Sequence, residues 1–261
     1  MDRLVQMGKI AFGVCAVSWM MAACSDDGSS ASSKVVESME LWKTERNTSE
    51  LVADIHFIYG KDGRLAQVSS DDAGGVPVMD INYVYSENND FQCVYTGDGG
   101  QRGRISATLE NGRIYSCQNA AASGTESYTY VYTDDGYLRK CDSREASFEY
   151  AWSGGNLLSV KSSERAYNST YETASVANDY SIDLNVLPHL ITGADYMEAM
   201  NTYCWLAGVL GKKSRNIAED TLYTYDYKYD GEGRLSEIVM QETLSFQDVS
   251  YTFRFVYPHN G

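Results

Sequence analysis

The sequence has few prolines, few histidines and too few basic residues to balance its acidic ones. It contains three prolines and three histidines in 261 residues, and 21 Lys and Arg stand against 36 Asp and Glu, for a formal net charge of −15. So few prolines exclude a Pro-rich linker protein. The acidic balance argues against a nucleic-acid partner, because phosphates require a basic surface, and against an electrostatic grip on anionic lipid.

Catalytic and metal-binding motifs are missing as well. The histidines, His56, His189 and His259, lack the spacing of zinc ligands, and no GxSxG, P-loop or HExxH motif is present. Carboxylates are numerous, but Asp134–Asp135 and Asp230–Glu232 lie in expected turns, where aspartate accepts local hydrogen bonds. We therefore expect no catalytic group, no metal and no cofactor, and a hydrolase is the least favoured function.

Long apolar runs are scarce, and the one near the N-terminus is typical of an export signal. Ile10–Met21 is apolar over 12 residues, too short to span a bilayer as a helix, and basic residues precede it. The small residues before Cys24 resemble the lipobox of bacterial lipoproteins, in which the chain is cut before the cysteine and the cysteine is acylated. The resemblance implies a signal peptide over 1–23, a lipid such as palmitate on Cys24, and a flexible tether over 24–34.

The residues after Cys24 resemble sorting signals. Ser25 resembles the residue that directs lipoproteins to the outer membrane, and Asp26–Asp27 resembles the export tag of surface lipoproteins in Bacteroidetes-type bacteria. The resemblance implies an outer-membrane lipoprotein at the cell surface, with the periplasmic face as the alternative, and the membrane as a partner through the lipid anchor.

Tyrosine is abundant, with 21 residues against seven Phe and four Trp. In YTYDYKYDGEGRL, from Tyr223, tyrosines alternate with other residues, which is the period of a strand with unlike faces. Gly231 and Gly233 are expected to supply the positive φ of a tight turn. Similar units recur about every 24 residues and together predict a long antiparallel meander. They begin at Phe57, Tyr83, Ala107, Tyr128 and Phe148.

One segment, within Tyr180–Asn216, lacks this alternation. Its apolar residues follow helical spacing and predict one helix near residues 194–210, ended by Gly211, that covers an open end or face of the sheet. A meander of this length curls or closes instead of staying flat. The predicted fold is all-β: a single domain over 35–261, closed or strongly curved into a soluble barrel-like sheet.

The tyrosine face of such a barrel points either to lipid or to the interior. In the first case Asp226 and Lys228 would line the lumen of a membrane barrel; in the second they would coat the outside. A lipid-anchored chain does not need to be integral, and tyrosine prefers interfaces to the bilayer centre. Leu, Ile and Val are also too sparse at the alternate positions for an apolar girdle. We favour the inward orientation.

Four cysteines remain after the leader, and we expect buried thiols. Cys117 and Cys141 occupy equivalent positions in successive hairpins, two strands or roughly 9–10 Å apart, which is beyond the reach of a disulfide. This pair is therefore predicted to be unbonded. The other two are Cys93 and Cys204.

The order of these features resembles a known family. The Gly-x-Leu hairpins resemble YD-type repeats. The succession of lipobox, hairpins, Ile182–Asn185 (IDLN), the turn at Leu206–Lys212 and Tyr-rich final hairpins resembles an uncharacterised family of Bacteroidetes outer-membrane lipoproteins described as having a porin-like fold. The resemblance implies that fold but no activity, so it transfers no functional residue.

Two kinds of binding function remain open. Aromatic rings stack on sugars, so the first hypothesis is a binding module for glycans or other extracellular ligands; the alternative is a structural or accessory surface protein that binds another protein through a sheet edge or the helix region. Exposed rings in a concavity would favour the first, whereas core rings are buried. Asp220–Leu222 also resembles a bacterial O-glycosylation site, which implies modification of Thr221. The candidate ligand platform is Tyr223, Tyr225, Tyr227, Tyr229, Trp152 and Trp205.

Overall fold

The computed structural model describes residues 34–96, 102–163, 168–174, 177–188, 199–243 and 249–258. The chain divides into two units, Met1–Ala31 and Ser32–Gly261, and every described residue belongs to the second. The predicted signal peptide and Cys24 lie outside the described residues, as do His189 and His259. None of the described helices has the length and apolar character that crossing a membrane requires.

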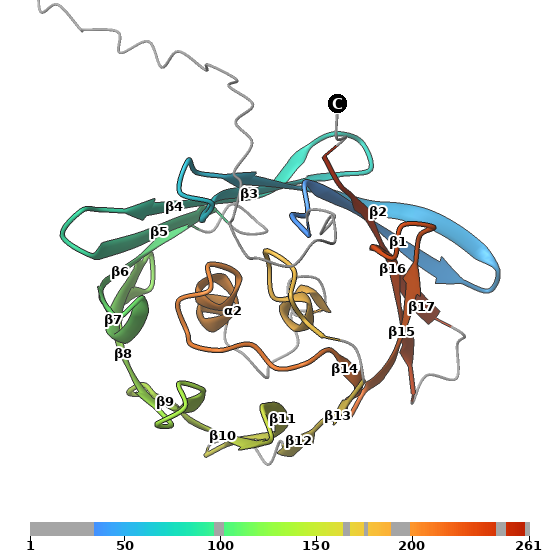
Figure 1. The fold of residues 1–261 in the computed structure, drawn as a ribbon. Coiled ribbons are helices and arrows are strands. Elements are labelled where there is room, and N and C mark those ends of the chain that lie inside the picture. The colour runs from blue at the N-terminus through green and yellow to red at the C-terminus, as the bar shows by residue number, and fades with distance from the viewer. Residues whose placement is uncertain are drawn as a thin grey trace, which may run out of the picture. The chain divides into compact units, whose positions relative to one another are not determined.

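The second unit is all-β, as predicted, and its strands form one nearly closed barrel-like sheet (Figure 1). The described residues form 17 strands: β1 (Ser38–Glu45), β2 (Thr48–Tyr59), β3 (Leu65–Asp72), β4 (Pro77–Tyr85), β5 (Asp90–Thr96), β6 (Arg102–Glu110), β7 (Arg113–Ala121), β8 (Gly124–Tyr132), β9 (Leu138–Asp142), β10 (Ser147–Ser153), β11 (Asn156–Ser162), β12 (Asn168–Thr170), β13 (Glu172–Thr173), β14 (Ile217–Glu219), β15 (Tyr223–Tyr229), β16 (Leu235–Glu242) and β17 (Val249–Val256).

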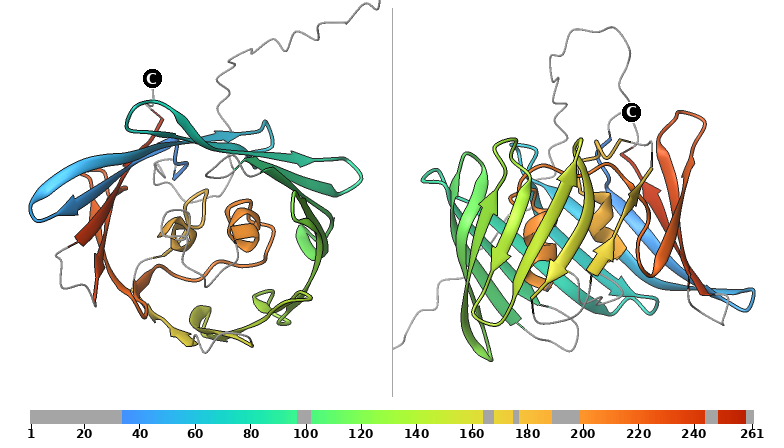
Figure 2. Two further views of the ribbon diagram at one scale, coloured as in Figure 1. Left: turned by 180° about the vertical axis from the view of Figure 1, so that it is seen from behind. Right: turned by 90° about the horizontal axis from the view of Figure 1, so that it is seen from below.

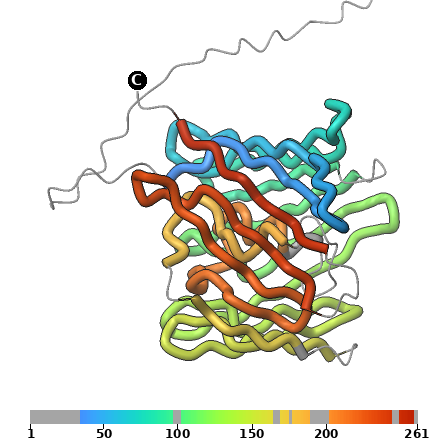
Figure 3. The backbone as a smooth tube through the Cα atoms, turned by 90° about the vertical axis from the view of Figure 1, so that its right-hand side faces the viewer, coloured from blue at the N-terminus to red at the C-terminus, as the bar shows by residue number. Residues whose placement is uncertain are grey.

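Antiparallel pairing runs around the ring. The last strand, β17, closes on β1 over the full length of both, and Figure 3 shows the red strand beside the blue one. β12 pairs with β11, and β13 pairs with β14. Only Tyr171 separates β12 from β13 in the chain, so the two short strands occupy one place in the ring. The ring is nearly closed: β15 pairs with β14 at Glu219 and Thr224 alone, so most of that side of β15 has no described strand partner.

Hairpin turns of one kind occur in four of the six repeated units of the sequence, those that begin at Phe57, Tyr83, Tyr128 and Tyr223. Each turn has five residues. The N–H of the first residue donates to the carbonyl of the fifth, and the N–H of the fourth residue donates to the carbonyl of the first. The fourth residue has a positive φ, which favours Gly or Asn. Gly233 fills this position with a φ of 76°, whereas Gly231, expected to share that role, is not among the positive-φ residues. The five turns are Gly60–Arg64, Asp72–Val76, Ser86–Asp90, Thr133–Tyr137 and Asp230–Arg234.

The barrel turns its apolar side chains inward and its polar side chains outward. Along β15, Tyr225 and Tyr227 pack against the core while Asp226 is exposed. Along β17, Phe253 is buried and its neighbour Arg254 is exposed. This is the reverse of a transmembrane barrel, which shows apolar residues to lipid and polar ones to its lumen. The predicted inward orientation of the tyrosines is confirmed.

A plug, described over residues 177–188 and 199–216, fills the barrel. It contains η2 (Leu184–Val186) and α2 (Ala199–Leu206), which lie within the ring of strands in Figures 1 and 2. The helix near 194–210 is thus present, but its described part ends at Leu206, and Gly208, with a φ of 70°, follows in place of the expected Gly211. Of the two places expected for the helix, an open end or a face of the sheet, it takes the second: it lies inside the barrel against the inner face, because the inward apolar faces of the strands need an apolar partner.

Candidate functional site

The tyrosines of the predicted platform face the plug, and their hydroxyls are already engaged. Tyr225 donates to Oδ2 of Asp220, and Tyr227 donates to the carbonyl of Ile217, each at 2.6 Å. Burial, reinforced by the charge of Asp220, raises the pKa of Tyr225 far above its ordinary value, so this hydroxyl remains a donor. These two rings therefore pack in the interior of the barrel.

The remaining platform residues are divided between interior and surface. Trp152 donates from Nε1 to the carbonyl of Leu138 at 2.6 Å. Trp205 lies in α2 and is 3 % exposed, which leaves no ring face for a sugar. Tyr223 is half-buried against the core. Only Tyr229, at the end of β15 and 43 % exposed, presents a large part of its ring to solvent.

The hollows beside these rings are too small for a ligand. One, lined by Tyr225 and Tyr227, measures about 10 Å³, and another, lined by Trp152 and Trp205, measures about 20 Å³. Ligand pockets measure roughly 300–1,000 Å³. Each hollow has room for about one water molecule. Ligand contact by the platform residues stays a prediction, which a variant of Tyr229 can test.

The plug is hydrogen-bonded to one rim of the barrel, the plug rim, which carries the turns Gly60–Arg64, Thr133–Tyr137 and Asp230–Arg234. Several backbone positions of the wall bond to the plug at this rim, and three of them lie on neighbouring parts of the wall. The pairs are Ile114 N–H to the Val209 carbonyl, Lys212 N–H to the Gly136 carbonyl, and Leu157 N–H to Ser214 Oγ, each at 3.0 Å. Because the bonds come from β7, the β8–β9 turn and β11, they hold the plug along an arc of the wall.

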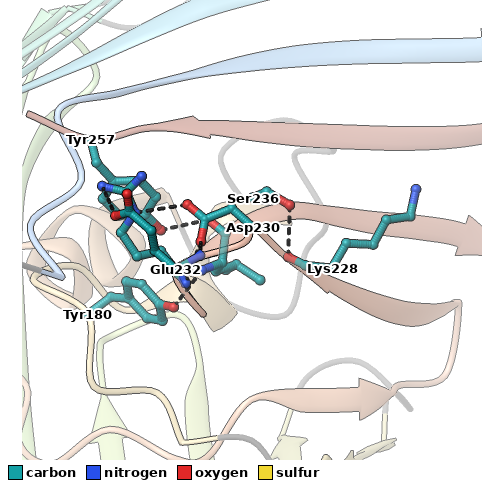
Figure 4. A network of polar contacts seen from close by, with 8 residues as sticks. Tyr180, Lys228, Asp230, Glu232, Ser236 and Tyr257 are labelled. Carbon is teal, nitrogen blue, oxygen red and sulfur yellow. Dashed lines mark hydrogen bonds and ion pairs between the residues drawn. The ribbon is translucent and has the colours of Figure 1, made fainter. Parts of the chain in front are cut away.

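Figure 4 shows the plug rim at Asp230. The carboxylate of Asp230 accepts the N–H and the Nε–H of Arg234, both at 2.8 Å, and the Arg234 guanidinium lies 5.2 Å from the centre of the Tyr257 ring. The next residue, Leu235, donates its N–H to the hydroxyl of Tyr180 in the plug at 2.9 Å. The Asp230 carboxylate therefore accepts hydrogen bonds within its own turn, as its position in the sequence predicted.

The IDLN segment, Ile182–Asn185, makes hydrogen bonds within the plug and from the plug to β14. Oδ1 of Asp183 accepts from Nδ2 of Asn178 at 2.6 Å and from the N–H of Asn185 at 3.1 Å. Asn185 in turn accepts the N–H of Ile217 at 2.9 Å, at the start of β14. Burial raises the pKa of the Asp183 carboxyl and lowers the pKa of the Lys213 ammonium in the same region. These contacts give the segment a structural role.

All four described cysteines are buried, and none of them is in a disulfide. Cys117 lies on β7 and Cys141 on β9, with β8 between them; the hydroxyl of Tyr130 on β8 lies 3.4 Å from Cys117 Sγ. The prediction that this pair is unbonded is confirmed. Burial raises the pKa of the Cys117 thiol to about 11, which keeps it in the unreactive form.

A larger hollow, which the sequence did not predict, lies on the outer wall across β5–β8, where the wall bends between β5 and β6 (Figure 1). It measures about 580 Å³. Two rows of outward side chains cross it, because opposed residues of antiparallel strands share a face. The first row is Gln92, Ser106, Gln118 and Ser127; the second is Asp90, Thr108, Ser116 and Thr129.

The polar side chains of the two rows are free to bond a ligand. Among the described residues, none forms a hydrogen bond with the side chain of Gln92, Gln118 or any Ser or Thr of the two rows. Each glutamine offers two N–H donors and an acceptor oxygen, and each hydroxyl both donates and accepts. The charged lining residues are two carboxylates, Asp90 and Glu110, and no lining residue is basic.

A β-bulge brings one aromatic ring into the hollow. Tyr115 and Ser116 on β7 together oppose Thr108 on β6, and both are exposed where regular alternation would bury one of them. Tyr115 is 39 % exposed. Its ring meets Tyr132 edge to face, with the centroids 5.2 Å apart and the planes at 69°. Tyr132 thus supports Tyr115 from one side and leaves another side to solvent.

Comparison with known proteins identifies the fold. No protein-family model matches the sequence, and no curated protein matches it. A porin-like protein from Bacteroides uniformis ATCC 8492 superposes with a TM-score of 0.60 at 18 % identity, over 86 % of this chain and 98 % of that one. A porin-like protein from Bacteroides vulgatus ATCC 8482 superposes with a TM-score of 0.57 at 11 % identity, over 86 % and 99 %. At these identities the likeness shows the fold alone, and it confirms that the chain has the barrel fold of porin-like Bacteroides proteins.

Proposed function

We propose that the chain is an outer-membrane-anchored lipoprotein that binds extracellular glycans on the outer wall of its barrel. The observation that carries the binding role is the hollow across β5–β8, whose volume of about 580 Å³ is that of a ligand site. Its free hydroxyl and amide groups match the hydroxyls of a sugar, which also donate and accept. The lipobox at Cys24 and the likeness to porin-like Bacteroides proteins support the outer-membrane location.

The barrel interior does not support passage of a solute. The plug packs apolar side chains against the wall, and the hollows beside it measure about 10 and 20 Å³. A porin requires a water-filled polar lumen. The ligand of this protein therefore binds from outside, on a wall that faces water.

A protein partner is less well supported. Binding through a sheet edge requires unpaired backbone groups. β1 and β17, the ends of the meander, pair with each other, which leaves a short stretch of β15, beyond its single pairing with β14 at Thr224, as an unpaired edge. Exposed apolar side chains such as Ile58, Val84 and Leu158 lie on β2, β4 and β11, and isolated exposed apolar residues are ordinary on a protein surface.

A thermal-shift screen of the unit Ser32–Gly261 against neutral and acidic glycans tests the proposal; this unit contains every described strand and the whole described core. A ligand at about a hundred times its Kd adds roughly 2.7 kcal/mol to the free energy of unfolding, which raises Tm by several degrees. The absence of any shift across the panel would overturn glycan binding.

A further inference from the structure

We infer that the outer hollow selects uncharged glycan chains and that Tyr115 is its stacking platform. This inference rests on the proposed function, and it adds the charge class of the ligand and the residue that holds a sugar ring. Neither property was predicted from the sequence, whose candidate aromatic residues lie on β10, α2 and β15.

The charges of the lining argue for a neutral ligand. Asp90 and Glu110 are its only charged residues, in a chain of net charge −15. A uronate or sulfate group bound there would lose hydration without gaining a cationic partner, and it would be repelled by the two carboxylates. A sugar hydroxyl loses only neutral hydrogen bonds to water, and the glutamines and hydroxyls of the hollow replace them.

The two rows argue for a chain of sugars. Gln92, Ser106, Gln118 and Ser127 stand on four adjacent strands, which lie about 4.8 Å apart, so their row extends about 14 Å. A row of that length is longer than one sugar ring. It offers similar donors and acceptors at each step, which suits a polymer with a repeating pattern of hydroxyls.

Tyr115 supplies the flat apolar surface that the rest of the lining lacks. Phe91 and Tyr128 also border the hollow, but both are buried. The bulge turns Tyr115 outward, and the edge contact with Tyr132 limits its motion, so little conformational freedom is lost when a ring stacks on it. Ser116, its partner in the bulge, places a hydroxyl beside the platform.

Isothermal titration of the unit Ser32–Gly261 tests both parts of the inference. The probes are neutral hexasaccharides (cello-, xylo-, manno- and laminarihexaose) and acidic chains (oligogalacturonate and chondroitin sulfate oligosaccharides). We expect binding by at least one neutral probe and by no acidic one. For the neutral probe, Tyr115→Ala raises Kd about tenfold or more, and Gln118→Ala raises it severalfold, whereas Tyr115→Phe keeps the ring and stays within about twofold of the original Kd.

Two further variants locate the site. Leu158→Ala removes a side chain on β11 whose exposed fraction, 44 %, is similar to the 39 % of Tyr115, and it leaves Kd unchanged. Tyr229→Ala removes the exposed ring of the predicted platform; a rise in Kd for this variant but not for Tyr115→Ala would overturn the assignment to the hollow. Tighter binding of acidic chains would overturn the charge selection and leave glycan binding intact. A failure of every probe to bind would overturn the proposed function itself.

Discussion

Replacing Leu206 by alanine should destabilise the barrel strongly, because this side chain is part of the plug. Leu206 is the last residue of α2 and is 2 % exposed. The barrel wall surrounds α2, so the structure cannot collapse easily into the space that a smaller side chain leaves. A buried Leu→Ala change of this kind costs roughly 2–5 kcal/mol, a large part of the about 5–15 kcal/mol that stabilises a typical domain.

Urea unfolding of the unit Ser32–Gly261 measures this cost, followed by tryptophan fluorescence, to which Trp205 in the plug contributes together with Trp42 and Trp152 in the wall. Leu158→Ala is the matched control: it deletes the same atoms from a side chain that is 44 % exposed, and it should change the free energy of unfolding by less than about 0.5 kcal/mol. Both variants should keep the parent m-value. If Leu206→Ala costs no more than the control, the interior is not packed around α2 and the argument for a filled lumen fails.

Two further predictions come from the described structure, and a third comes from the lipobox in the sequence. The four described thiols should resist maleimide in the native state and react together in urea, since all are buried; fast labelling of any native thiol would contradict this. Lys228, through a hydrogen bond and its charge, and then Arg254 hold the pKa of Glu237 below its ordinary value of 4.5. The stability gained is therefore present above that pH and lost as the pH falls, so Glu237→Gln should cost under about 1 kcal/mol near pH 7 and nothing near pH 2, as urea unfolding would show. Cys24→Ser should abolish incorporation of labelled palmitate in bacterial cells, and unchanged labelling would place the lipid elsewhere.

The wall of the barrel could be predicted because each strand carries its own pattern. Alternation around Tyr225 and Tyr227, followed by a turn with Gly233, specifies a hairpin with one apolar face without reference to the rest of the chain. The place of the helix could not be predicted in this way. Helical spacing shows that the segment around Trp205 has an apolar face, but many surfaces can cover such a face, and only closure of the sheet puts it inside.

The hollow escaped prediction for a related reason. Its rows are assembled from residues on four strands, such as Gln92 and Gln118, whose adjacency depends on register and not on spacing in the sequence. One local signal exists. In Ile114–Cys117, two inward residues are separated by two others, which breaks the period of two and is typical of a bulge. That break points to Tyr115 as a ring turned outward.

An NMR titration of the side-chain amides with a glycan that binds shows directly whether the hollow across β5–β8 is the binding site. The side chains of Gln92 and Gln118 line the hollow and have no described hydrogen-bond partner. The side-chain amide of Gln67, on β3, donates to Asp80 at 2.8 Å. The signals of Gln92 and Gln118 should shift with the glycan concentration, and the signal of Gln67 should not. Shifts confined to β15 and its surroundings, with the signals of Gln92 and Gln118 unmoved, would contradict binding in the hollow.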